Sequence, residues 1–403
     1  MNGTGGSISE VGIKSLSTVD RSCERKEFEE FFHDQFDQYF ARSETRQQAL
    51  HYVQSLLVES DPKSNGKKPP AYRKFSKSAQ RLFFGAQWDD EAVHHSLQDF
   101  IVAELGHEKG VCLIGVTYFS KKGEKTVGVQ AQFNRELKKD QNCQVCLFLG
   151  YASPKGCTFL DRRLYLPVEW TDDQIRRAEA KIPEDIEFRS KSDLALDMLH
   201  SVHAIGTPIH WVVGGEPFCS DTNLRNVIQA AGMNYILSGR DTDSSFRNLN
   251  HRQTPSDPTN QEDEACGSSI YKIVSGWNEK KWKRVIDHSN GDEICVFDWA
   301  SDRVLELQNE IEPQEVWLLS RRSVSQRCET AYFISNAAQD ATLAELAERI
   351  NDLGILDQMV SEACTMFKMD EYGVRHWNSW HRHITLSMIA HAWWVYKGKR
   401  TLR

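Results

Sequence analysis

The spacing of apolar residues predicts that the chain begins with helices. Between residues 24 and 40, six aromatic side chains recur at the spacing of one helix face. A second helix is expected to begin at Ser43, which can cap it, and a third to cover Asp89–Leu105, before a glycine. We therefore expect a helical N-terminal domain over residues 24–107. Residues 1–23 are rich in Gly, Ser and Thr without periodicity, and we expect a disordered tail there.

The pattern changes to short apolar runs after residue 107. Val111–Thr117 and Gln144–Leu149 are almost entirely apolar, and Lys125–Phe133 alternates between apolar and polar residues. The connections at Ser120–Gly123 and Lys138–Asn142 are short and polar. Three strands joined in this way predict an antiparallel meander.

Helices and strands then alternate. We expect a helix over Lys191–Ile205, a buried strand over Ile209–Val213, a helix over Asn223–Ala231 and a short strand over Tyr235–Leu237. A meander followed by helix, strand, helix and strand is the order of a ribonuclease-H-like α/β fold. A right-handed crossover would place the second buried strand parallel to the first, which brings positions near 115 and 215 together.

The rest of the chain predicts an insertion and a helical end. Arg240–Gly267 is polar and is expected to be a mobile loop. Strands are expected at Ile270–Val274, Glu293–Asp298 and Glu315–Leu319, and helices at Leu343–Met366 and Trp377–Trp394. The expected division of the core is a first part at 108–239, a β-rich insertion at 240–330 and completing helices at 331–403.

Composition narrows the class of protein. The 403 residues carry a net charge of −8 and a pI near 6.0, which argues against a uniformly basic nucleic-acid binder. The ten cysteines are scattered, and no signal peptide or membrane-spanning run is evident, so we expect an intracellular, cytoplasmic protein. Cys143 and Cys146 would point to opposite faces of a strand, so burial explains them better than a shared metal ion.

One stretch between Pro62 and Leu82 is strongly basic. It holds seven cations and no carboxylate: Lys63, Lys67, Lys68, Arg73, Lys74, Lys77 and Arg81. Such a concentration on an acidic protein is typical of contacts to a phosphate backbone. Its glycine and prolines also fit a solvated linker, and the sequence leaves both interpretations open.

The strand-rich middle also carries a family resemblance. The segments that carry it are Gly115-Val116-Thr117-Tyr118-Phe119, Lys121-Lys122-Gly123, Thr126-Val127-Gly128-Val129, Asn142–Val145, Asp161–Pro167, Trp299, Arg321-Arg322-Ser323 and Arg382–Leu386. Their letters and order resemble the catalytic core of the DDE transposases of bacterial insertion sequences, also described as DDE superfamily endonucleases. The resemblance covers most of Phe28–Ala392.

The resemblance implies metal-dependent cutting and joining of DNA, with three carboxylates holding two Mg²⁺ ions. Matched position by position, the family's first two carboxylates correspond to Gly115 and Gly215, and the third corresponds to Asp357. A lysine that the family has seven residues after the third carboxylate corresponds to Cys364. Two ligands are therefore missing. We expect no metal cofactor, unless carboxylates displaced from the family positions bind Mg²⁺: Glu216, Asp221 and Asp357.

Three hypotheses follow. The first is a transposase-derived protein that binds double-stranded DNA but cannot cut or join it. The second is an active Mg²⁺-dependent transposase that uses the displaced carboxylates. The third is a non-enzymatic protein that docks a partner through the insertion. The sequence does not reveal the oligomeric state, and a homodimer is one possibility.

Further candidate residues have two interpretations each. The remaining basic candidates could contact DNA phosphates or form structural ion pairs with carboxylates. They are Lys121, Lys122, Arg162, Arg163, Arg321 and Arg322. Helix packing or solvent exposure explains the histidines better than zinc does: His200, His203, His381, His383 and His391. Trp393 and Trp394 are expected in the core rather than stacked on a base.

Overall fold

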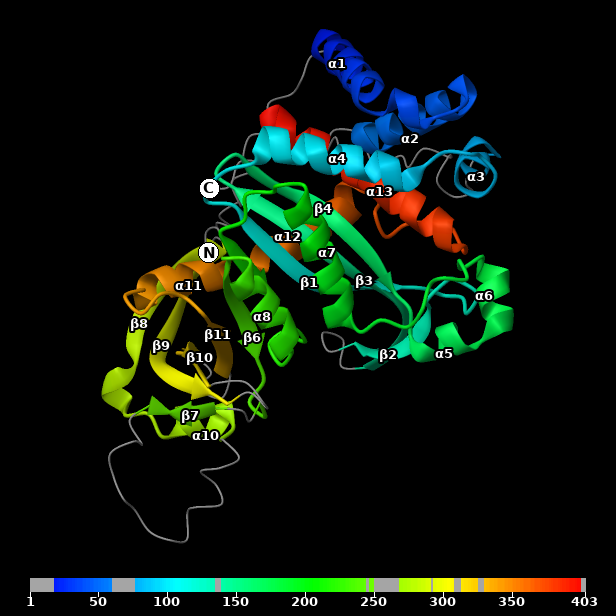
Figure 1. Cartoon of the computed structure of the whole chain (residues 1–403). Coiled ribbons are helices and arrows are strands. Elements are labelled where there is room, and N and C mark those ends of the chain that lie inside the picture. Colours follow the sequence, from blue (N-terminus) through cyan, green and yellow to red (C-terminus); the bar gives the residue numbers. More distant parts are fainter. Residues whose placement is uncertain are drawn as a thin grey trace, which may run out of the picture.

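The computed structural model describes residues 18–59, 77–134, 139–243, 246–249, 268–290, 293–307, 313–324 and 330–399. Figure 1 shows a layer of helices at the top, a twisted sheet below it, and a second lobe at the lower left where the sheet continues. The predicted mobile loop lies mostly outside the described residues, as do residues 1–17 of the predicted tail.

The first helices pack around a row of phenylalanines. Their bounds are α1 (Thr18–Phe36), the 3-10 turn η1 (Asp37–Tyr39), α2 (Ser43–Glu59), α3 (Lys77–Phe84) and α4 (Asp90–Leu105). Phe28, Phe32 and Phe36 are buried, as the helical spacing predicts. Asp89 caps α4 by accepting a hydrogen bond from Ala92 N at 3.0 Å. α3 was not predicted, and α1 already begins inside the expected tail.

All strands of the described residues belong to one 11-stranded sheet. They are β1 (Val111–Ser120), β2 (Gln130–Asn134), β3 (Lys139–Ser153), β4 (Gly156–Tyr165), β5 (Trp211–Gly214), β6 (Asn234–Gly239), β7 (Phe246–Asn248), β8 (Lys283–Asn290), β9 (Glu293–Glu306), β10 (Gln314–Ser323) and β11 (Thr330–Ser335). The order is β2-β3-β1-β5-β6-β11-β10-β9-β7, with β4 paired to β3 and β8 paired to β9.

The centre of the sheet has the predicted connectivity. β1 runs antiparallel to β3, and β3 runs antiparallel to β4. β5 is parallel to β1, and β6 is parallel to β5. The crossover helices α7 (Lys191–Ala204) and α8 (Thr222–Ala230) lie on one face, while α12 (Leu353–Phe367) lies behind the sheet (Figure 1). The α/β fold class with a ribonuclease-H-like core is confirmed.

The predicted meander is wrong in its details. Lys125–Val129 does not form a strand, because Gly128 turns the chain at φ 71° and buries Val127 and Val129 in a turn. The predicted connection at Lys138–Asn142 belongs mostly to β3. β4 was not predicted, and it completes a meander that runs β1, β3, β4.

The second lobe contains a further correction. β11, β10, β9 and β7 continue the sheet beyond β6. The predicted strand Ile270–Val274 is instead α10 (Ile270–Ser275), because the Ser269 side chain accepts a hydrogen bond from Lys272 N and starts a helix. A separate apolar cluster that includes Trp299 and Phe333 fills this part of the sheet.

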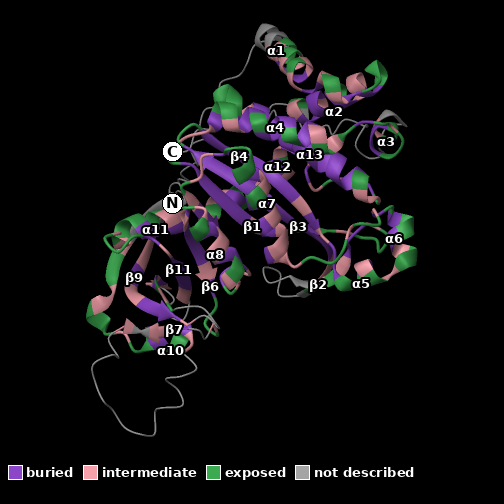
Figure 2. Ribbon diagram, in the orientation of Figure 1, coloured by how far each residue is buried: buried purple, intermediate pink, exposed green. Residues whose placement is uncertain are grey.

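The remaining helices are α5 (Val168–Asp172), α6 (Gln174–Ala180), α11 (Leu343–Asn351), α12 (Leu353–Phe367), α13 (Trp377–Trp394) and the π-helical turn η6 (Val395–Lys399). α13 has the predicted bounds and is almost entirely buried, as Figure 2 shows. The single helix predicted over Leu343–Met366 is two helices that meet at Asp352. No helix of the described residues is long and apolar enough to cross a membrane.

Candidate functional site

The strand register brings the two glycine positions together. Ile114 of β1 pairs with Gly214 of β5, so Gly115 and Gly215 are the next residues on two neighbouring parallel strands. The prediction that these positions are neighbours is confirmed. Both strands lie inside the sheet, between β3 and β6, and the positions therefore meet where β5 ends.

The space at these two glycines differs. A Cβ atom on Gly115 would lie 2.4 Å from Cδ2 of Leu356, closer than side chains approach one another. Leu356 belongs to α12 and is buried. A Cβ atom on Gly215 would meet nothing within 4 Å among the described residues. An apolar side chain therefore occupies the space beside position 115, and position 215 is open.

Asp357, at the position of the family's third carboxylate, lies on α12 next to Leu356 but on a different side of that helix. Successive residues of an α-helix are rotated by about 100°, so Asp357 cannot face β1 in the way that Leu356 does. Asp357 is exposed. Cys364, at the position of the expected lysine, is half-buried, and burial raises the pKa of its thiol to about 12. It is therefore neutral and supplies no cation near the strands.

The displaced carboxylates have structural partners. Glu216 lies 3.5 Å from Nε of Arg240. Asp221 caps α8, accepting a hydrogen bond from Leu224 N at 2.9 Å. A metal site would need three or more His, Cys, Asp or Glu side chains whose ligand atoms lie close together. The described part of the chain has one such group, with its ligand atoms within 4.8 Å of one another. It contains none of Glu216, Asp221 or Asp357.

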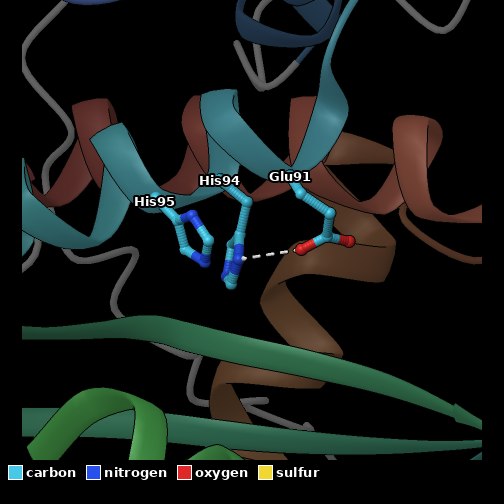
Figure 3. A group of neighbouring side chains, drawn as sticks. All are labelled: Glu91, His94 and His95. Atoms are coloured by element: carbon cyan, nitrogen blue, oxygen red, sulfur yellow. Dashed lines mark ion pairs between the residues drawn. The ribbon is translucent and has the colours of Figure 1, made fainter. Parts of the chain in front are cut away.

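That group consists of Glu91, His94 and His95 on α4 (Figure 3). His94 is 2% exposed; its Nε2 lies 3.2 Å from the Leu160 carbonyl and its Nδ1 lies 2.9 Å from Nη1 of Arg162. These contacts fit a neutral ring that donates from Nε2 and accepts at Nδ1. The Arg162 guanidinium stands where a metal ion would bind His94 and Glu91, so the group does not fit a cation.

Arg162 is the centre of a buried charge network rather than a DNA contact. Its side chain has no exposed surface and donates two hydrogen bonds to Glu91, at 3.0 and 3.3 Å, and one to Oγ1 of Thr385 at 3.1 Å. Asp161 is also fully buried and accepts from Nη1 of Arg163 at 2.6 Å. The interpretation of Arg162 as a phosphate contact is wrong, because a buried guanidinium cannot reach a duplex.

The same network shifts the pKa values of its members. Burial by itself would raise the pKa of Glu91, but the Arg162 charge beside it lowers the value to about 2. Burial and the Arg162 charge hold the pKa of His94 well below its usual range. Burial raises the pKa of Asp161 despite the two arginines. The network joins α4, β4 and α13, and its role is structural.

The two lysines that follow β1 differ in exposure. Lys121 donates a hydrogen bond to the Asp370 carbonyl at 3.0 Å and lies 3.4 Å from the Tyr372 ring centroid. Burial lowers the pKa of Lys121 to about 8. Lys122 is exposed and stays a candidate DNA contact.

The two arginines of β10 both lie over aromatic rings. Arg321 lies over Phe297, at 4.4 Å from the ring centroid. Arg322 is mostly buried, lies over Trp282, and donates to both oxygens of Glu279 at 3.1 and 2.6 Å. A structural ion pair therefore explains Arg322.

The basic stretch is only partly described. Lys63, Lys67, Lys68, Arg73 and Lys74 lie outside the described residues. Lys77 begins α3, and Arg81 on the same helix is exposed, with Nη1 at 3.5 Å from Oε1 of Glu44. Contact between this stretch and DNA stays a prediction.

The remaining candidate residues are the histidines, the cysteine pair and the two tryptophans, and each is either exposed on a helix or packed in the core. His200 and His203 are exposed on α7. The α13 histidines His381, His383 and His391 are buried, and burial lowers the pKa of both His381 and His383 to about 3. Cys143, Cys146 and Trp393 are buried, and Trp394 packs against the core. These environments match the packing interpretations.

Sequence reasoning did not identify Leu356 as the residue that fills the space beside Gly115. A weak signal existed, because Leu356 directly precedes the third family position in an apolar run of α12. That signal gives the helix face but cannot show which strand residue the side chain reaches.

The sequence also matches a known protein family. A family model described as DDE superfamily endonuclease matches residues 35–292, more than half of the chain. The match contains Gly115 and Gly215 and ends before Asp357. No curated protein matches the chain.

Proposed function

Because the chain belongs to the DDE superfamily endonucleases, we propose that it is a transposase-derived protein that binds DNA without cutting or joining it. The observation that carries this proposal is the pairing of β1 with β5. It brings together the two positions at which the family places metal-binding carboxylates, and in this chain both positions are glycine.

The local chemistry supports the loss of metal binding. Two divalent ions about 3.5–4 Å apart require several carboxylate ligands from neighbouring elements. Glycine has no ligand atom, and the Leu356 side chain replaces the first carboxylate with hydrocarbon. Glu216 and Asp221 are held by Arg240 and by the α8 backbone. The residues present therefore do not fit a pair of Mg²⁺ ions, and the active-transposase hypothesis gains no support.

The DNA-binding part of the proposal is supported by charge distribution. The stretch from Lys63 to Arg81 carries seven cations and no carboxylate, on a chain whose net charge is −8. Each phosphate that a lysine or arginine neutralises releases condensed counterions, which gives binding a steep dependence on salt. We therefore propose that the protein binds double-stranded DNA by contacting the phosphate backbone of the DNA.

A nicking assay tests the first half of the proposal. Supercoiled plasmid incubated with the protein and Mg²⁺ or Mn²⁺ should stay supercoiled, with or without EDTA. Nicking that EDTA abolishes would refute the proposal. Fluorescence anisotropy with a labelled duplex at several salt concentrations tests the second half, and the absence of salt-dependent binding to any duplex would refute that half.

Restoration of the ligands is the converse experiment. The triple substitution Gly115→Asp, Gly215→Asp and Asp357→Glu places three carboxylates at the family positions. Because Leu356 occupies the space beside position 115, the triple variant should gain Mn²⁺ binding more readily when Leu356→Ala is added. Equal metal binding with and without that fourth substitution would show that Leu356 does not block the site.

A further inference from the structure

A second basic surface lies in the sheet extension, away from the Lys63–Arg81 stretch. The segment Trp277-Asn278-Glu279-Lys280-Lys281-Trp282-Lys283-Arg284 runs from just after α10 into the start of β8 and contains four cations and two tryptophans. We call it the Trp277–Arg284 ridge. β8 pairs only with β9 within the described sheet, and Figure 1 shows it on the outer side of the lower-left lobe.

The ridge presents cations to solvent. Lys280 and Lys283 are exposed, and neither has an ion-pair partner among the residues that the structure describes. Arg284 has Nε 3.0 Å from Oδ1 of Asp298, yet 59% of its side chain is exposed. Lys281 pairs with Asp302. Two lysines and part of an arginine are therefore available to a polyanion.

The tryptophans and Arg322 hold the ridge in place. The Arg322 guanidinium lies 4.1 Å from the Trp282 ring centroid and is fixed by two hydrogen bonds to Glu279. Trp277 and Trp282 have ring centroids 6.2 Å apart, and Nζ of Lys281 lies 5.1 Å from the Trp277 ring. These contacts fix the segment that carries Lys280 and Lys283, so phosphate binding would order only their side chains.

The local charge complements a phosphate backbone. With Arg322 included, the ridge and its contacts contain five cations (Lys280, Lys281, Lys283, Arg284 and Arg322) and three carboxylates (Glu279, Asp298 and Asp302). This excess of positive charge stands on a chain of net charge −8. Lysines on an edge strand can also serve only to prevent pairing with another chain. That explanation covers Lys283 but not Lys280, which precedes the strand.

We propose that the Trp277–Arg284 ridge is a contact surface for the phosphate backbone of duplex DNA, with Lys280, Lys283 and Arg284 as the contacting side chains. The inference rests on the proposed DNA-binding function and assigns to it a surface separate from the Lys63–Arg81 stretch. The tryptophans position the cations. Because the contacts are to phosphates, the ridge adds affinity for every sequence equally.

The experiment measures duplex binding by fluorescence anisotropy across a series of salt concentrations. The test variant is Lys280→Ala with Lys283→Ala, and a Lys→Gln pair at the same positions keeps the side-chain length. The matched control is Lys109→Ala with Lys155→Ala, which removes two exposed lysines from the α4–β1 and β3–β4 connections that likewise have no ion-pair partner among the described residues. Thermal unfolding confirms that the variants are folded.

Each lost phosphate contact should reduce the slope of log affinity against log salt by about 0.9, so the ridge variants should lose about 1.8 from the slope. The control should keep the wild-type slope. If the wild type binds and the ridge variants also keep its slope, the inference is refuted while the proposed function stands. If the wild type binds no duplex, both are refuted.

Discussion

Two regions of this protein differ in where charged residues lie: the junction of β1 and β5, and the contact between α4, β4 and α13. Where β1 meets β5, the family's chemistry requires carboxylates, and the chain has two glycines and a buried leucine. Where α4, β4 and α13 meet, no reaction is expected, yet the chain buries Asp161 and Arg162 completely beside Glu91 and His94. Charged residues in the sequence therefore mark the structural network, and uncharged residues stand at the positions where the family places its metal-binding carboxylates.

The difference follows from what each charge contacts. A buried charge is retained only when partners compensate the loss of water, and Arg162 has Glu91, Asp161 and Thr385 as partners. Carboxylates gathered to hold metal ions repel one another when the ions are absent. Under the proposed function, which requires no ions at this position, uncharged residues avoid that repulsion.

The largest expected effect is on the charge network. Arg162→Ala leaves the buried Asp161 without one of its two arginines and leaves Glu91 without its ion pair, and it should lower the free energy of unfolding by about 3–5 kcal/mol. Urea denaturation monitored by circular dichroism measures the change. The control is Arg189→Ala, because Arg189 is exposed and its partner Asp197 is partly exposed, and it should cost less than about 1 kcal/mol. Similar losses for the two variants would contradict a structural role for Arg162.

The next effect concerns packing beside Gly115. Gly115→Ala places a methyl group 2.4 Å from Cδ2 of Leu356 and should cost about 1–3 kcal/mol by overpacking. Gly215→Ala is the matched control, which meets no described atom within 4 Å and should change stability by no more than about 0.5 kcal/mol. Urea denaturation of both variants gives the comparison.

Leu356→Ala completes a double-mutant cycle with Gly115→Ala. Alone it should cost about 2–5 kcal/mol, because it leaves a cavity. In the double variant the new methyl group enters that space, so the combined cost should be smaller than the sum of the two single costs. Additive costs would show that the two side chains do not share the space.

Several features of the fold could be predicted from sequence because their causes are local. α13 and α4 follow from the spacing of their buried residues, and the adjacency of Gly115 and Gly215 follows from the handedness of a crossover. β4 was missed because Asp161, Arg162 and Arg163 resemble a surface segment in the sequence. Their partners are distant in the chain: Glu91 lies on α4 and Thr385 on α13.

The candidate site could be predicted only in part. The glycine positions were found from the resemblance, but the position of the Leu356 side chain beside Gly115 depends on how α12 packs on β1, far away in sequence. The ridge was missed because Glu279 directly precedes its cations in the sequence, and only the structure shows that Glu279 pairs with Arg322.

The smallest expected effect is on the pH dependence of stability. The pKa of Glu91 is about 2 in the folded protein and about 4.5 by ordinary values. A carboxylate with a lowered pKa stabilises the fold above its unfolded pKa and loses that contribution as pH falls toward its folded pKa. The stability difference between wild type and Glu91→Gln should therefore shrink between pH 4.5 and about 2. Urea denaturation across this range measures it, and a difference independent of pH would contradict the ion pair with Arg162.

Isothermal titration calorimetry with Mn²⁺ tests most directly the proposal that the junction of β1 and β5 does not hold metal ions. The wild-type protein should show no binding in the micromolar range, because Gly115 and Gly215 provide no ligand and Leu356 fills the space beside the first. Micromolar binding of Mn²⁺ that Asp357→Ala abolishes would contradict the proposal.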